Sequence, residues 1–259
     1  MLLNTGNNVG DGFQTSRKEK SISMNKLKYL LPIRSIIFIA IFVSGALLFN
    51  KKLDEISNWW SITASIVNIL LIIFLVSVTK KADTSYLSLI NYKKGVTKPK
   101  QIILTTLLIL VVGMGGMYLA GFICYGVIPY AAPMMIAPIP LWLAILNILV
   151  LPVTTALAED GLYLGCGVNQ IKNKYLAIFV PAFFFALQHS FIPVLFDVQY
   201  ILYRFLSFLP LTIILCWNYY KNRNPLPIMV GHTVIDLITA LQILMTSAVP
   251  EIYEMMCNL

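Results

Sequence analysis

The chain has 259 residues, of which 58% are hydrophobic and only 12% are charged. A soluble domain averages roughly 45–50% apolar and about 25% charged residues, so the composition excludes an ordinary soluble protein and predicts a polytopic membrane protein. The net charge of +8 does not indicate a nucleic-acid partner. The basic residues lie in short clusters between apolar runs, where they act as topology signals in a lipid bilayer.

Residues 1–28 are polar and contain the basic run Arg17-Lys18-Glu19-Lys20. We expect a flexible cytoplasmic tail, since nothing in this stretch can bury a core. Residues 29–259 then form the transmembrane domain. The first apolar segment is too long for the apolar part of a signal peptide, and we expect it to stay as an anchor.

A membrane-spanning helix needs about 20 apolar residues. Seven runs qualify, which predicts an all-α bundle of seven transmembrane helices at about 30–49, 60–78, 102–128, 138–158, 175–194, 198–218 and 226–248. The proline-rich stretch 129–140 could hold a half-helix, so an eighth segment stays open. Gly113, Gly115, Gly116 and Gly121 in the third run indicate close helix packing.

Lysine and arginine gather in alternate loops. The tail and the 79–101 loop are rich in them, whereas the stretches 129–137 and 195–197 have none. Because cytoplasmic loops carry an excess of these residues, we expect a cytoplasmic N-terminus, in the plasma membrane of a prokaryote.

The chain has two histidines, His189 and His232, and both lie in short polar islands within apolar segments. A third island holds Glu159 and Asp160. Ionisable groups at membrane depth usually serve function. With a rise of about 1.5 Å per residue, and if the fourth helix continues to about residue 170, all three islands lie roughly 14–22 Å from the cytoplasmic ends of their helices. They are therefore expected to meet.

Spacing within the islands suggests which side chains share a face. His232 and Asp236 are four residues apart, so the carboxylate can fix the tautomer of the imidazole. Phe185 stands four residues before His189 and gives that ring an aromatic wall. Adjacent helical residues point about 100° apart, so Glu159 and the following aspartate border one cavity only if it wraps around their helix.

An acid with two imidazoles in a water-accessible pocket suits hydrolysis. Glu159 is the candidate general base toward water, and His189 and His232 can hold a metal, polarise the scissile carbonyl or stabilise the oxyanion. A divalent metal such as zinc, with these three side chains as candidate ligands, and a metal-free site both stay open. The four cysteines form no CxxC pair, and the chain contains neither HExxH nor GxSxG.

Three motifs in order, Glu159-Asp160-x-x-Tyr163-Leu164-Gly165, Phe185-x-x-x-His189 and His232-x-x-x-Asp236, resemble those of the CPBP (CAAX protease and bacteriocin-processing, or Abi) intramembrane proteases. The resemblance covers about residues 100–250. It implies an endopeptidase acting on peptides or membrane-anchored proteins, of the CAAX type or of the type linked to bacteriocin processing and self-immunity. It also implies that Glu159 activates water, that the two histidines assist, and that Asp236 occupies the oxyanion or orienting position.

Two positions depart from the family pattern Glu-Glu-x-x-x-Arg. The second acid is Asp160, and Leu164 stands where the family has Arg. Asp160 is then expected to be protonated and to support the Glu159 site as a hydrogen-bond donor. Arg204 is one candidate for the missing cation, although snorkelling to a lipid headgroup is the preferred interpretation for it and for Arg34.

The departures leave two rival functions open. One is a catalytically inactive family member that acts as an immunity or regulatory scaffold. The other is a proton-coupled transporter, which could use the same buried acids, although no inverted repeat with paired broken helices is evident.

Overall fold

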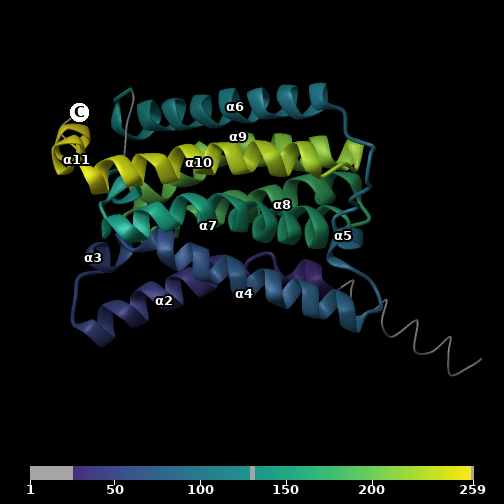
Figure 1. Ribbon diagram of the computed structural model, residues 1–259, viewed down its shortest axis with the longest axis horizontal. Coiled ribbons are helices and arrows are strands. Elements are labelled where there is room, and N and C mark those ends of the chain that lie inside the picture. The colour runs from purple at the N-terminus through teal and green to yellow at the C-terminus, as the bar shows by residue number, and fades with distance from the viewer. Residues whose placement is uncertain (1–25, 129–131, 258–259) are drawn as a thin grey trace, which may run out of the picture.

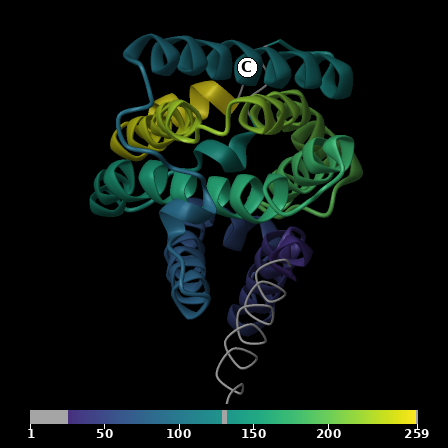
Figure 2. The same ribbon diagram turned by 90° about the vertical axis from the view of Figure 1, so that its right-hand side faces the viewer.

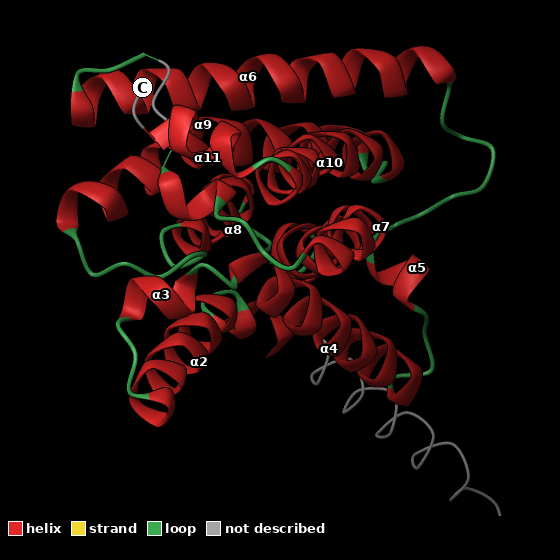
Figure 3. Ribbon diagram, turned by 60° about the vertical axis from the view of Figure 1, so that its left-hand side comes forward, coloured by secondary structure: helices red, strands yellow, loops and turns green. Residues whose placement is uncertain are grey.

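The computed structural model describes residues 26–128 and 132–257. Most of the tail predicted for residues 1–28 therefore lies outside the described residues. The described part consists of helices joined by loops and contains no strand (Figure 3). The elements are η1 (Lys26–Leu30), α2 (Ile33–Phe49), α3 (Leu53–Ser57), α4 (Trp60–Lys81), α5 (Tyr86–Leu89), α6 (Pro99–Tyr125), η2 (Pro133–Ile136), α7 (Leu141–Asp160), η3 (Gly161–Val168), α8 (Lys174–His189), α9 (Val198–Asn222), α10 (Leu226–Ala248) and α11 (Pro250–Cys257).

Six helical segments of the described chain are long and apolar enough to cross a membrane, which confirms an all-α integral membrane protein. They are Lys26–Phe49, Trp60–Lys81, Pro99–Tyr125, Leu141–Val168, Val198–Asn222 and Leu226–Ala248. The seventh expected helix is present but shorter.

That helix, α8, ends at His189 instead of near residue 194. Pro193 has no N–H with which to continue the ladder to the carbonyl of His189. A buried arginine from α9, Arg204, donates its Nε to that carbonyl instead, at 3.2 Å.

The proline-rich segment before α7 does not form a half-helix in its described part. Pro133–Ile136 make a single 3₁₀ turn, and the backbone then runs extended into Pro140 at the start of α7. The described residues therefore contain no eighth spanning segment.

The helices lie in layers (Figure 1). The long helix α6 forms one outer side and packs on α9 and α10, which in turn pack on α8 and α7 respectively. On the opposite side lie α2 and α4, which diverge from the bundle as two separate arms (Figure 2). Along part of their length, α4 packs on α7 and α2 contacts α8.

The glycines of α6 allow the close packing expected of them. A Cβ built on Gly116 would lie 2.6 Å from the backbone oxygen of Ser207, and one on Gly113 would lie 2.7 Å from Cδ1 of Ile235. A side chain at Gly116 would push α6 away from α9, and one at Gly113 would displace the side chain of Ile235 on α10. Gly115 faces open space instead.

The fourth spanning helix continues past Asp160, as expected, but its last eight residues, Gly161–Val168, form a π-helix. Such segments are frequently found at functional sites.

The glycines in this stretch leave room for neighbours, since a Cβ on Gly161 would lie 2.8 Å from the Tyr86 ring. The Tyr86 hydroxyl donates to the carbonyl of Leu157, 2.5 Å away, and burial raises the pKa of this phenol well above its ordinary value, which keeps it a donor.

Candidate active site

Glu159 and Asp160 occupy the last turn of α7, directly before the π-helical segment. Both side chains are buried, with Glu159 at 2% exposure and Asp160 at 0%. A buried carboxylate is costly without a partner, so the partners of these two acids define the site.

The cation beside Glu159 comes from the N-terminal arm α2. Arg34 Nη2 lies 2.8 Å from Glu159 Oε1, and the side chain of this arginine is only 1% exposed. The expectation that Arg34 snorkels to the headgroups is therefore wrong. Arg34 thus brings a guanidinium to the motif in which Leu164 stands at the position of the family's arginine. Leu164 is fully buried in the apolar core.

Two amide side chains fix the orientation of Arg34. Its Nε donates to Gln188 Oε1 at 2.5 Å, and its Nη1 donates to Asn68 Oδ1 at 2.8 Å. The hydroxyl of Tyr163 also donates to Gln188 Oε1, at 3.0 Å. All three N–H faces of the guanidinium are thus occupied, which leaves one rigid arrangement for the arginine and for the carboxylate beside it.

Both histidines face the second oxygen of Glu159. His232 Nε2 lies 3.7 Å from Glu159 Oε2, and His189 Nε2 lies 3.9 Å from it. This oxygen has no hydrogen-bond partner among the described residues. The three polar islands meet at this point, as expected from their depths.

His232 contacts both of the other acids. Its Nδ1 lies 3.3 Å from Asp160 Oδ1, and its Nε2 lies 3.5 Å from Asp236 Oδ2. The ring of His232 therefore joins the two adjacent carboxylates of α7, and no cavity has to wrap around that helix. Asp160 has an imidazole as its partner where the family pattern suggested an arginine.

The tautomer of His189 follows from its neighbour. Its Nδ1 lies 2.8 Å from the carbonyl oxygen of Phe185, which can only accept, so Nδ1 carries a proton and Nε2 of the neutral ring is an acceptor. Phe185 stands beside the ring as expected, with centroids 5.9 Å apart. Phe208 of α9, which the sequence did not indicate, stacks much closer at 3.6 Å and holds the imidazole plane.

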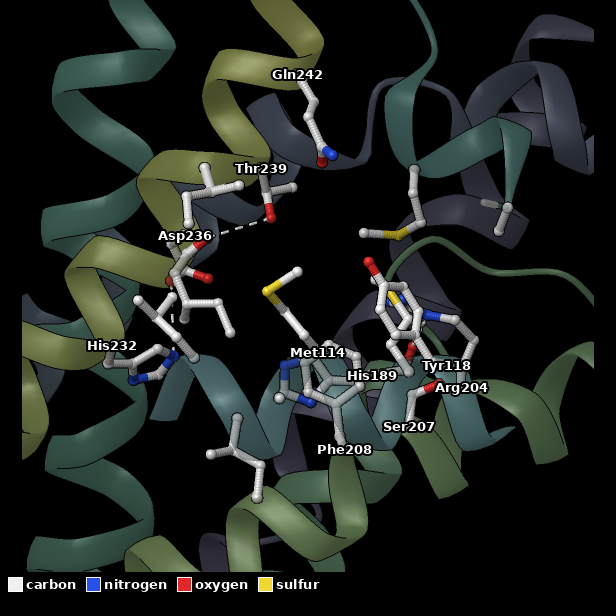
Figure 4. A pocket seen from close by; sticks show the side chains of 18 of the residues that line it. Met114, Tyr118, His189, Arg204, Ser207, Phe208, His232, Asp236, Thr239 and Gln242 are labelled. Carbon is white, nitrogen blue, oxygen red and sulfur yellow. Dashed lines mark hydrogen bonds and ion pairs between the residues drawn. The ribbon is translucent and has the colours of Figure 1, made fainter. Parts of the chain in front are cut away.

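A cavity of about 340 Å³ opens on this cluster (Figure 4). His189, His232 and Asp236 line it, and most of the remaining lining residues are apolar, many of them from α6, α9 and α10. In Figure 4 the two histidines lie on different walls and face the same space. An apolar cavity with a few convergent polar groups is the usual form of a ligand site.

Arg204 lies on the wall of the same cavity and is 3% exposed. Its Nε and Nη2 donate to the backbone carbonyls of His189 and Ile192. It neither snorkels to the headgroups nor pairs with an acid of the described chain, so both sequence interpretations of Arg204 are wrong.

The candidate metal ligands do not fit a metal centre. The described residues contain no group of three His, Cys, Asp or Glu side chains arranged to hold an ion. Oε1 of Glu159 is already neutralised by Arg34 at 2.8 Å, and that cation would repel a divalent ion at the same carboxylate.

Fold and site together define a membrane-embedded helical bundle with a buried acid–histidine cluster at the end of an apolar cavity. Residues 140–238 match the family model described as Type II CAAX prenyl endopeptidase Rce1-like, and all three motifs fall within this range. This part of the chain is therefore similar to the CAAX protease (CPBP) family, as the motifs indicated. No curated protein and no solved structure matches the chain.

Proposed function

We propose that the protein is an intramembrane endopeptidase of the CAAX type that hydrolyses a peptide bond by water activated at Glu159. The main support for this proposal is Oε2 of Glu159, which has no hydrogen-bond partner among the described residues. Arg34 binds Oε1, and Oε2 is directed toward two imidazole nitrogens less than 4 Å away. A carboxylate held in this way is suited to general-base catalysis.

Glu159 Oε2 and His189 Nε2 are both acceptors, and they stand 3.9 Å apart. A water molecule that bridges them can donate one proton to each, which orients an oxygen lone pair toward a carbonyl in the cavity. When this oxygen attacks the carbonyl carbon, its proton passes to Glu159. Collapse of the tetrahedral intermediate breaks the C–N bond, and the same carboxyl returns the proton to the leaving amine.

The opposite histidine is suited to the oxyanion. Asp160 Oδ1 lies 3.3 Å from His232 Nδ1, and an ionised Asp160 that accepts from this nitrogen would favour the Nδ1–H tautomer or the imidazolium of the ring. In its protonated form the ring directs Nε2–H toward the cavity, where it can stabilise negative charge on the carbonyl oxygen. Asp236, 3.5 Å from Nε2, is then an orienting carboxylate for this ring.

The cavity is suited to a substrate with apolar side chains or a lipid group. A CAAX motif carries a prenylated cysteine followed by three C-terminal residues, and hydrolysis after that cysteine would release a tripeptide. The largely apolar wall formed by α6, α9 and α10 is suited to such a chain. We place the N-terminus in the cytoplasm because of the loop lysines, and the protein in the plasma membrane of a prokaryote.

An inactive immunity or regulatory scaffold was the main rival, because Leu164 removes the family's arginine. The position of Arg34 favours an active enzyme over an inactive scaffold. A guanidinium is present at Glu159, although it comes from another helix than in the family pattern. The cluster of Glu159, Asp160, His189 and His232 does not favour a proton-coupled transporter over a hydrolase.

The direct test uses purified full-length protein in liposomes with a farnesylated CAAX peptide, and detects the released tripeptide by mass spectrometry. Wild type should release it and Glu159→Gln should not. Glu55→Gln is a matched control, because Glu55 is exposed on α3. No product from any CAAX peptide with wild type would contradict the proposal.

A further inference from the structure

Arg204 is a buried cation with no acid partner among the described residues. The residue is 3% exposed and forms no ion pair within the described part of the chain. Its Nε and Nη2 donate to neutral backbone carbonyls, and neither hydrogen bond uses Nη1. Burying a charge is expensive unless it is paired. The other buried arginine of the bundle, Arg34, has such a partner in Glu159.

Arg204 lies close to His189, one of the proposed reacting groups. Its Cζ lies 4.9 Å from the centre of the Phe208 ring, and that ring stacks on His189 with centroids 3.6 Å apart. An extended residue spans at most about 3.3–3.6 Å, so three residues cover about 10 Å. The guanidinium thus lies within three residues' reach of a bond held at His189, and both residues line the same cavity.

We propose that Arg204 binds the C-terminal carboxylate of the substrate and so sets the distance between the chain end and the cleaved bond. This inference rests on the proposed function and names the feature of the substrate that the cavity selects. Arginine is suited to the task, since its planar fork matches a carboxylate and remains charged in an apolar site. A free chain end would supply the negative charge that Arg204 lacks.

A purely structural role makes a different prediction. Arg204 also caps the carbonyls at the end of α8, and its loss could displace His189. Such damage would lower the turnover of every substrate by the same factor. Loss of carboxylate recognition would affect only substrates with a free C-terminus. The chemistry of the substrate's chain end therefore separates the two roles.

The first test is binding, which does not require catalysis. We would measure the shift in thermal unfolding of the purified full-length protein with an acetylated tripeptide of two aliphatic residues and methionine, as the acid and as the amide. The acid should raise the Tm of wild type and the amide should not. In Arg204→Gln the two should act alike. Equal shifts by both forms in wild type would overturn the inference.

The second test is cleavage of a farnesylated CAAX peptide with a free or an amidated C-terminus. A hydrogen bond between charged groups corresponds to a factor of about 10–100, so the amide should raise the KM of wild type by that factor. Arg204→Gln should remove the difference, Arg204→Lys should keep part of it, and Lys174→Gln, which removes an exposed cation, should leave it intact.

If Arg204→Gln slows both peptides equally and the acid–amide difference persists, the arginine is only structural. If wild type binds the acid but cleaves neither peptide, the proposed function fails while the inference on binding stands.

Discussion

Arg34 Nη2 and Glu159 Oε1 are 2.8 Å apart although 125 positions separate the two residues in the chain. This contact joins the N-terminal arm α2 to the motif-bearing part of the bundle. It places next to the candidate active site a helix that lies outside the range matched by the family model.

Removing this cation should impair both stability and turnover. Arg34→Gln leaves Glu159 buried without a counter-charge, which should cost about 3–5 kcal/mol in the free energy of unfolding. The misplaced carboxylate should lower kcat by about 100-fold. Arg34→Lys keeps the charge and should recover part of the activity. Thermal unfolding and peptide turnover measure the two effects, and full activity in Arg34→Gln would contradict a positioning role.

The two histidines should act as a unit with Glu159. His189→Ala and His232→Ala should each remove nearly all activity, and combining either with Glu159→Gln should add little. Rates of the single and double variants, corrected for the amount of folded protein in the membrane, give the comparison. Fully additive losses would instead indicate independent structural roles.

Asp160 should tolerate an amide better than an alanine. Asp160→Asn keeps an oxygen that can accept from His232 Nδ1 at the present 3.3 Å, whereas Asp160→Ala leaves that nitrogen without this partner. We expect Asp160→Asn to retain the larger share of wild-type turnover. Equal and complete loss in both variants would show that the negative charge itself takes part.

Two neighbouring glycines of α6 provide a matched test of the packing. A Cβ at Gly116 would lie 2.6 Å from the backbone of α9, so Gly116→Ala should destabilise the protein by about 1–3 kcal/mol. Gly115 meets nothing within 4 Å, and Gly115→Ala should be neutral or stabilising by up to about 1 kcal/mol. Unfolding midpoints of the two variants that coincide would contradict the packing of α6 on α9.

The sequence predicted the helical bundle and the meeting of Glu159, His189 and His232, because apolar length and helix rise determine both. It did not predict Arg34 as the partner of Glu159. A single arginine near the end of an apolar run has the same local pattern whether it snorkels or is buried, and no short-range spacing links it to residue 159. The available signal was the missing cation at Leu164, which left Arg34 and Arg204 as the arginines within apolar segments. The π-helix and the stacking of Phe208 depend on tertiary packing and have no local sequence pattern.

The most direct test of the account is the rate of tripeptide release from a farnesylated CAAX peptide by the Glu159→Gln variant. The substitution keeps the side-chain volume and removes only the base, so the protein should accumulate in the membrane and lose about 10²–10⁴-fold in activity. Wild type and Glu55→Gln should release the tripeptide at equal rates. A Glu159→Gln variant that retains more than about a tenth of the wild-type rate would contradict general-base catalysis at this residue.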